Sequence, residues 1–159
     1  MLAELMRTSE GYEARFERHW PHAPEQVWSW LTDNAKLKQW FSELSVDDLR
    51  EGGAYKFDMG DGTFEEMPIF ELRTNAALAF AWGEDRVLFE LASEADGCRL
   101  MLVETIGKLS DHTPRDLAGW HVCLDAIREL MDGRTIESRM DEWKKAYEEY
   151  KPLVEHLRR

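Results

Sequence analysis

One stretch of the sequence decides the fold: residues Pro114 to Met131, which read PRDLAGWHVCLDAIRELM. Pro114 suits the first position of a helix, and Gly133 suits the position just after a helix ends. The apolar side chains between them recur at three- and four-residue spacing, as Leu117, Trp120, Leu124, Ile127 and Met131. This spacing predicts one long amphipathic helix whose apolar face packs against another layer.

The sequence before this helix shows the alternation that is typical of β-strands. Leu78, Phe80 and Trp82 alternate with the small residues Ala79 and Ala81, which is the pattern of a strand with one buried face. Similar segments cover residues 44–50, 54–59, 63–73, 86–94 and 98–107, after a first strand from Tyr12 to Trp20. Together with 77–82, they predict an antiparallel sheet of about six to seven strands.

Turn residues separate these segments. The chain has the pairs Gly52-Gly53, Asp61-Gly62 and Asp96-Gly97 between strand-like stretches. Asp-Gly is a pair that two-residue hairpin turns prefer, because both positions need a positive φ. We therefore expect tight hairpins between neighbouring strands.

Two short helices are predicted after the first strand. Pro24 breaks the strand and suits a helix start, and the apolar residues between 25 and 31 have helical spacing. The pair Asp33-Asn34 interrupts this pattern before a second short helix, which carries Leu37, Trp40 and Phe41. The segment is therefore two short helices rather than one long one.

A further helix is expected near the C-terminus, from Ser138 to about His156. Its larger apolar side chains are Met140, Trp143, Tyr147, Val154 and Leu157. Residues 134–159 are expected to pack on the domain as an additional C-terminal helix. Pro152 is expected to end or kink this helix, because proline removes a backbone donor.

Length and charge restrict the class of protein. A chain of 159 residues has the size of one ordinary domain, so we expect a single domain over residues 1–159. The net charge of −12 disfavours binding to nucleic-acid phosphates and to anionic membrane surfaces. No apolar run is long enough to span a bilayer, and charges interrupt the N-terminal residues where a signal peptide would be apolar. We expect a soluble, cytoplasmic protein that neither binds nucleic acid nor inserts into a membrane.

The sequence carries no familiar catalytic, metal or cofactor motif. It has two cysteines, Cys98 and Cys123, which lie far apart and outside any metal-ligand spacing, and we expect both to be reduced and buried. The patterns of serine hydrolases, zinc peptidases, phosphate-binding loops and dinucleotide-binding loops are absent. No metal and no cofactor are predicted.

Several residues, taken in order along the chain, resemble one superfamily. They are Val27-Trp28 after Pro24, Trp40-Phe41, Gly52-Gly53, Asp61-Gly62, Leu78-x-Phe80-x-Trp82, Val87-x-Phe89-x-Leu91, Leu100-x-Leu102, and Gly119-Trp120 with Leu124. This set resembles the helix-grip superfamily known as SRPBCC or START-like, and within it the branch named after the activator of the heat-shock protein 90 ATPase. The resemblance implies an α+β, helix-grip fold in which a curved antiparallel sheet wraps around the long helix.

The resemblance also implies a cavity between the sheet and the long helix. The residues expected to line it are Trp28, Trp40, Phe57, Phe80, Trp82, Phe89, Leu100, Leu102, Glu104, Trp120, His121 and Leu124. The alternative is that the aromatic residues pack as an ordinary core. Glu104 alternates with apolar residues on the last strand, where a carboxylate needs a partner. If Glu104 met His121, the two could bind a polar group or transfer a proton. The alternative is a structural pair, or a histidine that faces water.

Three functions are open at this point. The first is binding of a small hydrophobic molecule, aromatic or lipid-like. Such binding would serve to signal stress or to carry the compound. The second, which the resemblance to this branch implies, is a co-chaperone-like role in protein interaction, with a heat-shock protein 90 homologue as the partner. The third is also implied by the resemblance, because the superfamily includes cyclases and hydrolases: an enzyme of this type that uses Glu104 and His121. We expect enzymatic activity less than binding.

Overall fold

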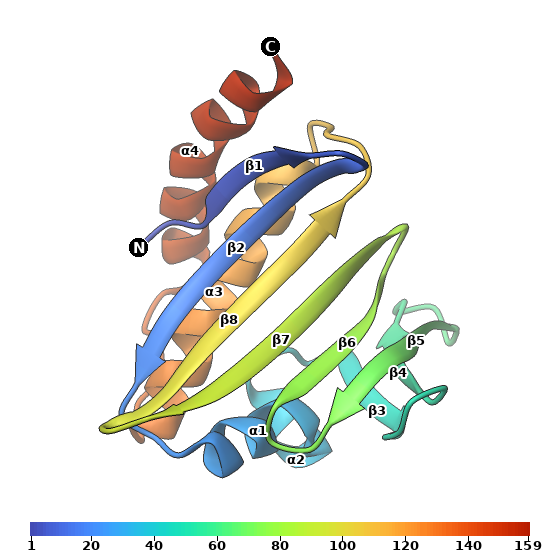
Figure 1. The fold of residues 1–159 in the computed structure, drawn as a ribbon, viewed down its shortest axis with the longest axis vertical. Helices are drawn as coiled ribbons and strands as arrows, with labels where there is room; N and C mark the ends of the chain where they lie inside the picture. The colour runs from blue at the N-terminus through green and yellow to red at the C-terminus, as the bar shows by residue number, and fades with distance from the viewer. The chain divides into compact units, whose positions relative to one another are not determined.

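The computed structural model describes residues 1–159 and contains eight strands and four helices. The strands are β1 (Glu4–Thr8), β2 (Gly11–Trp20), β3 (Leu44–Asp48), β4 (Ala54–Asp58), β5 (Phe64–Arg73), β6 (Ala77–Trp82), β7 (Asp85–Glu94) and β8 (Gly97–Ile106). The helices are α1 (Pro24–Thr32), α2 (Asn34–Trp40), α3 (Thr113–Met131) and α4 (Arg139–Arg158). The strand order is β1-β2-β8-β7-β6-β5-β4-β3 (Figure 1). The predicted α+β helix-grip class is confirmed, with one strand more than the sequence indicated.

The additional strand is β1, which forms an antiparallel hairpin with β2. Glu4 pairs with Arg15 and Thr8 pairs with Gly11. The sequence of β1, ELMRT, is rich in helix-forming residues and lacks clean alternation. Its strand conformation comes from pairing with β2 and from packing against α4, and neither contact is visible in a local pattern.

The chain forms two compact units. The terminal unit comprises Met1–Phe16 and Thr105–Arg159, and the central unit comprises Glu17–Glu104. Strands β2 and β8 each begin in one unit and end in the other.

In the terminal unit, α4 packs against α3 and β1 (Figure 1). The buried face of α4 carries Ala146, Tyr150 and Val154, which recur every four residues as a helix face requires. The sequence pointed to Trp143 and Tyr147 instead, because large aromatic side chains outweigh a small alanine in a hydrophobic pattern. Trp143 and Tyr147 stack on each other at the edge of this face, with ring centroids 5.3 Å apart.

The prediction that Pro152 ends or kinks α4 is wrong as regards the end, because the helix continues to Arg158. Val154, which follows the proline, is 1% exposed. Burial of this side chain holds the last turn in place and outweighs the backbone hydrogen bond that proline removes.

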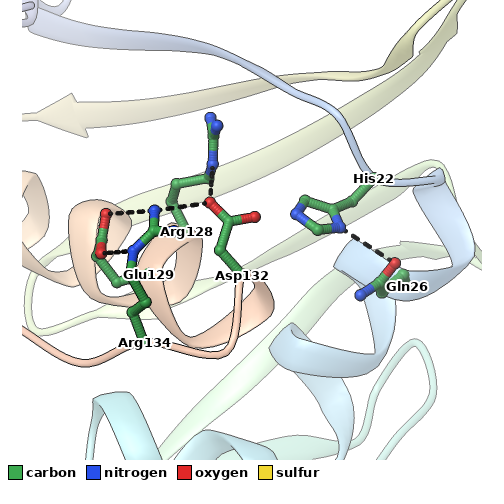
Figure 2. A network of polar contacts seen from close by, with 6 residues as sticks. All are labelled: His22, Gln26, Arg128, Glu129, Asp132 and Arg134. Atoms are coloured by element: carbon green, nitrogen blue, oxygen red, sulfur yellow. Dashed lines mark hydrogen bonds and ion pairs between the residues drawn. The ribbon is translucent and has the colours of Figure 1, made fainter.

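A group of charged side chains closes the C-terminal end of α3 (Figure 2). Arg128 pairs with Asp132 at 2.7 Å, and Arg134 pairs with Glu129 at 2.8 Å. The backbone reverses at Gly133, whose φ is 79°, as is common just after a helix. The hydrogen bond from Arg134 lowers the pKa of the Glu129 carboxyl group. The helix end predicted from Gly133 is thus present, and it is reinforced by ion pairs.

In the central unit, α1 and α2 are joined at Asp33, which interrupts the helix as the sequence indicated. The Asp33 side chain accepts a hydrogen bond of 3.0 Å from the backbone N–H of Ala35, so it caps α2. Ahead of α1, the ring of His22 lies 3.3 Å from the Gln26 side-chain oxygen (Figure 2). The strands β3 to β7 follow as antiparallel neighbours, and β6 is buried along most of its length.

The two Asp-Gly pairs do not form the turns that were predicted. Asp61-Gly62 lies inside a longer loop between β4 and β5, because the Asp58 and Asp61 side chains accept hydrogen bonds from the N–H groups of Gly60 and Thr63. Gly97 is the first residue of β8, so the turn before it is formed by residues 95 and 96.

Candidate functional site

Three half-buried aromatic rings meet in the central unit: Phe41, Phe57 and Trp82. We call them the aromatic triad. The ring centroids of Phe41 and Phe57 are 5.9 Å apart, those of Phe41 and Trp82 are 5.8 Å apart, and those of Phe57 and Trp82 are 6.1 Å apart. All three pairs are close to edge-to-face, with interplanar angles between 75° and 83°, which is a favoured geometry for aromatic rings. The triad therefore combines apolar surface, defined geometry and partial access to solvent.

Backbone geometry positions the members of the triad. Phe41 is the first residue after α2, and its N–H donates a hydrogen bond of 2.7 Å to the Leu37 carbonyl. Phe57 lies in β4 opposite Leu44 of β3. Trp82 is the last residue of β6, next to the hairpin at Gly83. The triad thus joins the end of a helix to two strands.

The indole of Trp40 fixes the helix end from which Phe41 projects. Its Nε1–H donates a hydrogen bond of 2.8 Å to the backbone carbonyl of Trp30 in α1. Trp40 is 2% exposed, so this bond is shielded from water and holds α2 against α1. Trp40 also contacts Phe41, with ring centroids 6.0 Å apart.

Three further aromatic rings form a buried layer in the same unit: Tyr55, Phe80 and Phe89, each 2% exposed or less. Tyr55 and Phe80 stack with centroids 4.5 Å apart, and Phe80 and Phe89 lie 6.4 Å apart. The Tyr55 hydroxyl donates a hydrogen bond of 2.6 Å to the Leu31 carbonyl. Burial raises the pKa of Tyr55, so the phenol stays protonated and remains a donor.

Most of the lining residues predicted in the central unit are part of its core. Trp28, Trp40, Phe80, Phe89, Leu100, Leu102 and Glu104 are 7% exposed or less. Phe57 and Trp82 are the two predicted residues of this unit that remain half-buried. The assignment of the buried residues to a ligand site stays a prediction.

Glu104 lies on the buried face of β8, where the alternation of the strand predicted it. Its residue is 1% exposed, and Leu100, Leu102 and Ile106 on the same face are also buried. Unlike its apolar neighbours, a carboxyl group at such a position needs hydrogen bonds or a charged partner to offset the loss of water. Glu104 is therefore the most polar group on that face of β8.

In the terminal unit, the side chains of Trp120 and Leu124 on α3 are buried, at 2% and 1% exposed, and His121 is half-buried. The Nδ1 atom of His121 lies 2.8 Å from the hydroxyl of Tyr150 in α4. Its Nε2 atom lies 3.6 Å from a carboxylate oxygen of Asp125. The Tyr150 hydroxyl also accepts a hydrogen bond of 2.9 Å from the N–H of Ala3. His121 is therefore one member of a polar network that joins α3, α4 and the N-terminal residues.

The sequence reasoning missed three residues: Phe41, Tyr55 and Tyr150. Tyr55 alternates with Phe57 in β4, so the period of the strand was a usable signal. Phe41 was expected within the second short helix, but α2 ends at Trp40 and Phe41 is the residue after it. Tyr150 is recognisable only when Ala146 is counted as part of the buried face of α4.

No group of three or more His, Cys, Asp or Glu side chains is arranged to hold a metal ion. Cys98 and Cys123 are both buried, and neither forms a disulfide. None of the helices combines the length and the apolar composition that crossing a bilayer requires.

A family model described as Activator of Hsp90 ATPase homolog 1-like protein matches residues 21–132. Among curated proteins, none matches the chain significantly. The match covers most of the chain, from the proline turn after β2 to the end of α3.

Solved structures share the fold. A conserved protein of unknown function from Enterococcus faecalis matches with a TM-score of 0.85 and 23% identity, over 98% of this chain and 91% of that one. CalU16 from Micromonospora echinospora matches with a TM-score of 0.73 and 22% identity, over 96% and 95% of the two chains. The Aha1 dimer from Colwellia psychrerythraea matches with a TM-score of 0.63 and 16% identity, over 74% and 93%. Identities this low show a common fold and nothing more about function.

Proposed function

The chain belongs to the family of Activator of Hsp90 ATPase homolog 1-like proteins, and on this premise we propose that it binds a small hydrophobic molecule, aromatic or lipid-like, at the aromatic triad. The match of the family model confirms the family that the sequence indicated. The ligand and its site are our proposal.

The observation that carries the proposal is the partial exposure of Phe41, Phe57 and Trp82 beside a fully buried aromatic layer. A chain that needed these rings only for stability would gain by burying them completely, because each Å² of apolar surface removed from water contributes about 25 cal/mol. Rings held in fixed edge-to-face geometry also lose little entropy when a ligand packs on them. Both properties favour a binding surface.

The expected affinity is modest. If a ligand and the triad together bury roughly 200 Å² of apolar surface, the contribution is about 5 kcal/mol, which corresponds to a dissociation constant of about 0.2 mM. A ligand that buries more apolar surface than this would bind more tightly. The other predicted lining residues, including Trp120, His121 and Leu124, are not needed for binding at the triad and stay predictions from the sequence.

A panel titration tests this function. The protein is titrated to millimolar concentration with flavonoid-like aromatic compounds and with medium-chain fatty acids, and backbone and aromatic chemical shifts are followed by NMR. We expect saturable shift changes for at least one compound, centred on Phe41, Phe57 and Trp82. The absence of saturable changes for every compound would contradict the proposal. Native mass spectrometry of freshly purified protein would add the mass of any molecule that co-purifies.

A co-chaperone-like role in protein interaction is the second candidate, and one surface feature favours it. Met59 and Phe64 flank the loop between β4 and β5 and are 53% and 57% exposed. Exposed apolar side chains of this size are common at protein interaction sites. A pull-down with the heat-shock protein 90 homologue of the same cell tests this role. Retention of the homologue by the wild type and its loss in a Met59→Ser/Phe64→Ser double variant would support it.

The enzymatic reading has no observation in its favour. The His121 ring is engaged by Tyr150 and Asp125 within the terminal unit, as a structural histidine would be. A catalytic role for Glu104 and His121 therefore stays a prediction from the sequence.

A further inference from the structure

Arg18 lies on the buried face of β2. Ala14, Phe16 and Trp20 have the same parity in the strand, and they are 0%, 0% and 4% exposed, so the side chain between Phe16 and Trp20 shares their face. The Nη1 atom of Arg18 donates a hydrogen bond of 2.9 Å to the backbone carbonyl of Glu17. Its Nη2 atom is buried and makes no hydrogen bond.

Other arginines of the chain have carboxylate partners. Arg15, on the opposite face of the same strand, pairs with Glu13 at 3.2 Å, and Arg50 and Arg73 pair with Asp48 and Glu71. The chain has 32 acidic and 20 basic residues, so carboxylates are in excess. Arg18 is paired with none of them, and its buried Nη2 atom has no acceptor.

A buried guanidinium N–H without an acceptor is unfavourable, because it has lost water and gained nothing in return. A carboxylate is the group that best completes it, since guanidinium and carboxylate match in charge and in planar geometry. Nη2 offers two N–H donors to such a group. The surrounding face of the strand is apolar, so the rest of the partner must be apolar as well.

We propose that Arg18 binds the carboxylate of a hydrophobic monocarboxylic acid. The inference rests on the proposed function and makes it more specific: the natural ligand is an acid, and its carboxylate accepts hydrogen bonds from the Arg18 guanidinium. Long-range electrostatics acts against such a ligand, because the net charge of −12 repels anions. A preference for the acid would therefore have to come from a local donor.

Decanoate and methyl decanoate provide the test. They have the same apolar chain, and only decanoate carries the charge. Their dissociation constants for the wild-type protein are measured by isothermal titration calorimetry, below the micelle concentration of decanoate. We expect decanoate to bind at least about tenfold more tightly than the ester, as a charge-assisted hydrogen bond in a buried site provides. Equal affinities would overturn the role of Arg18 and leave the proposed function standing. Failure of both compounds to bind would overturn this inference, and the proposed function would fall with it only if every compound of the panel titration also failed to bind.

Two variants locate the effect. Arg18→Met should bind both compounds with the affinity that the wild type shows for the ester. Arg15→Met is the matched control: it removes the same charge from the same strand, but from a side chain that is 48% exposed, and it should keep the preference for decanoate. Retention of the preference in Arg18→Met would contradict the proposal.

A stability measurement separates ligand binding from a structural role. Without ligand, Arg18→Met should keep or raise the Tm, because it replaces a buried donor that has no acceptor with an apolar side chain of similar length. A fall in Tm of several degrees would show that Arg18 supports the fold and would overturn its assignment to a ligand. The comparison of acid and ester in the wild type remains valid whether or not either variant folds.

Discussion

The hydroxyl of Tyr55 donates a hydrogen bond of 2.6 Å to the backbone carbonyl of Leu31, and this bond ties β4 to the last turn of α1. Tyr55 is 1% exposed, so water cannot replace the bond if it is lost. Because Tyr55 also stacks on Phe80, the bond links the buried aromatic layer to the pair of helices that precedes Phe41.

Tyr55→Phe should lower the free energy of unfolding by about 1–3 kcal/mol, because the Leu31 carbonyl is left buried without its donor. Urea unfolding measures the change. Tyr12→Phe is the control, since the Tyr12 hydroxyl has no intramolecular hydrogen bond, and its effect should stay within about 0.5 kcal/mol. Equal effects of the two substitutions would contradict the assigned role of Tyr55.

Tyr150→Phe should destabilise the terminal unit by about 1–3 kcal/mol, because Ala3 N–H loses its acceptor and His121 loses its partner. Hydrogen exchange is the sharper measurement: the amide of Ala3 should exchange faster in the variant. Tyr147→Phe, on the same helix, removes a hydroxyl that makes no such bond and should leave the exchange of Ala3 unchanged. Unchanged exchange in Tyr150→Phe would show that the network does not hold the N-terminal residues.

Substitution of two glycines by alanine should change the stability of the protein in opposite directions. A Cβ at Gly97 would lie 2.0 Å from the Trp20 carbonyl oxygen, and the φ of Gly97 is +150°, so Gly97→Ala forces the backbone of β2 and β8 to move. A loss of about 2 kcal/mol or more is expected. Gly119 lies in α3 with nothing within 4 Å of an added Cβ, so Gly119→Ala should gain up to about 1 kcal/mol. Thermal unfolding distinguishes the two, and a tolerated Gly97→Ala would contradict the strand geometry.

His19 should titrate above its usual pKa of 6.5. The hydrogen bond to Glu94 contributes most to the raised pKa, and the hydrogen bond to Glu17 is the second cause. The ring nitrogens Nδ1 and Nε2 lie 2.9 Å from carboxylate oxygens of Glu94 and Glu17, respectively. Because the pKa is raised in the folded state, the protonated ring stabilises the fold below the unfolded-state value, and this contribution is lost as the pH rises through the folded-state pKa. NMR of the imidazole protons measures the value. Glu94→Gln should lower it, and Glu90→Gln, on the same strand without a contact to His19, should not.

The sequence predicted the secondary structure well wherever the hydrophobic periodicity was regular over a whole helix or strand. The pattern around Leu117 and Leu124 predicted α3, and the alternation around Phe80 predicted β6, because burial of one face imposes these spacings directly. The family followed from a set of residues distributed along the chain from Val27 to Leu124. Strand β1 was missed because its conformation depends on β2 and α4, which a local pattern does not contain.

The candidate site was less predictable than the fold. Apolar character identified the aromatic residues, but it could not separate the half-buried Phe57 and Trp82 from the buried Phe80 and Phe89, since exposure depends on tertiary packing. The sequence placed Phe41 in the second short helix as part of its apolar set, whereas Phe41 lies just beyond the end of α2. Arg18 reads as an ordinary surface arginine in sequence, and only the burial of its neighbours Phe16 and Trp20 shows which face it occupies.

The central claim is that the aromatic triad binds ligand, and a matched pair of phenylalanine variants tests it most directly. The best ligand from the panel is titrated by calorimetry into the wild type, Phe57→Ala and Phe64→Ala. Phe64 lies in the adjacent strand and is 57% exposed, so its removal deletes the same side chain outside the triad. We predict that Phe57→Ala raises the dissociation constant at least about fivefold and that Phe64→Ala leaves it unchanged. Equal affinities of the wild type and a folded Phe57→Ala variant would contradict the account.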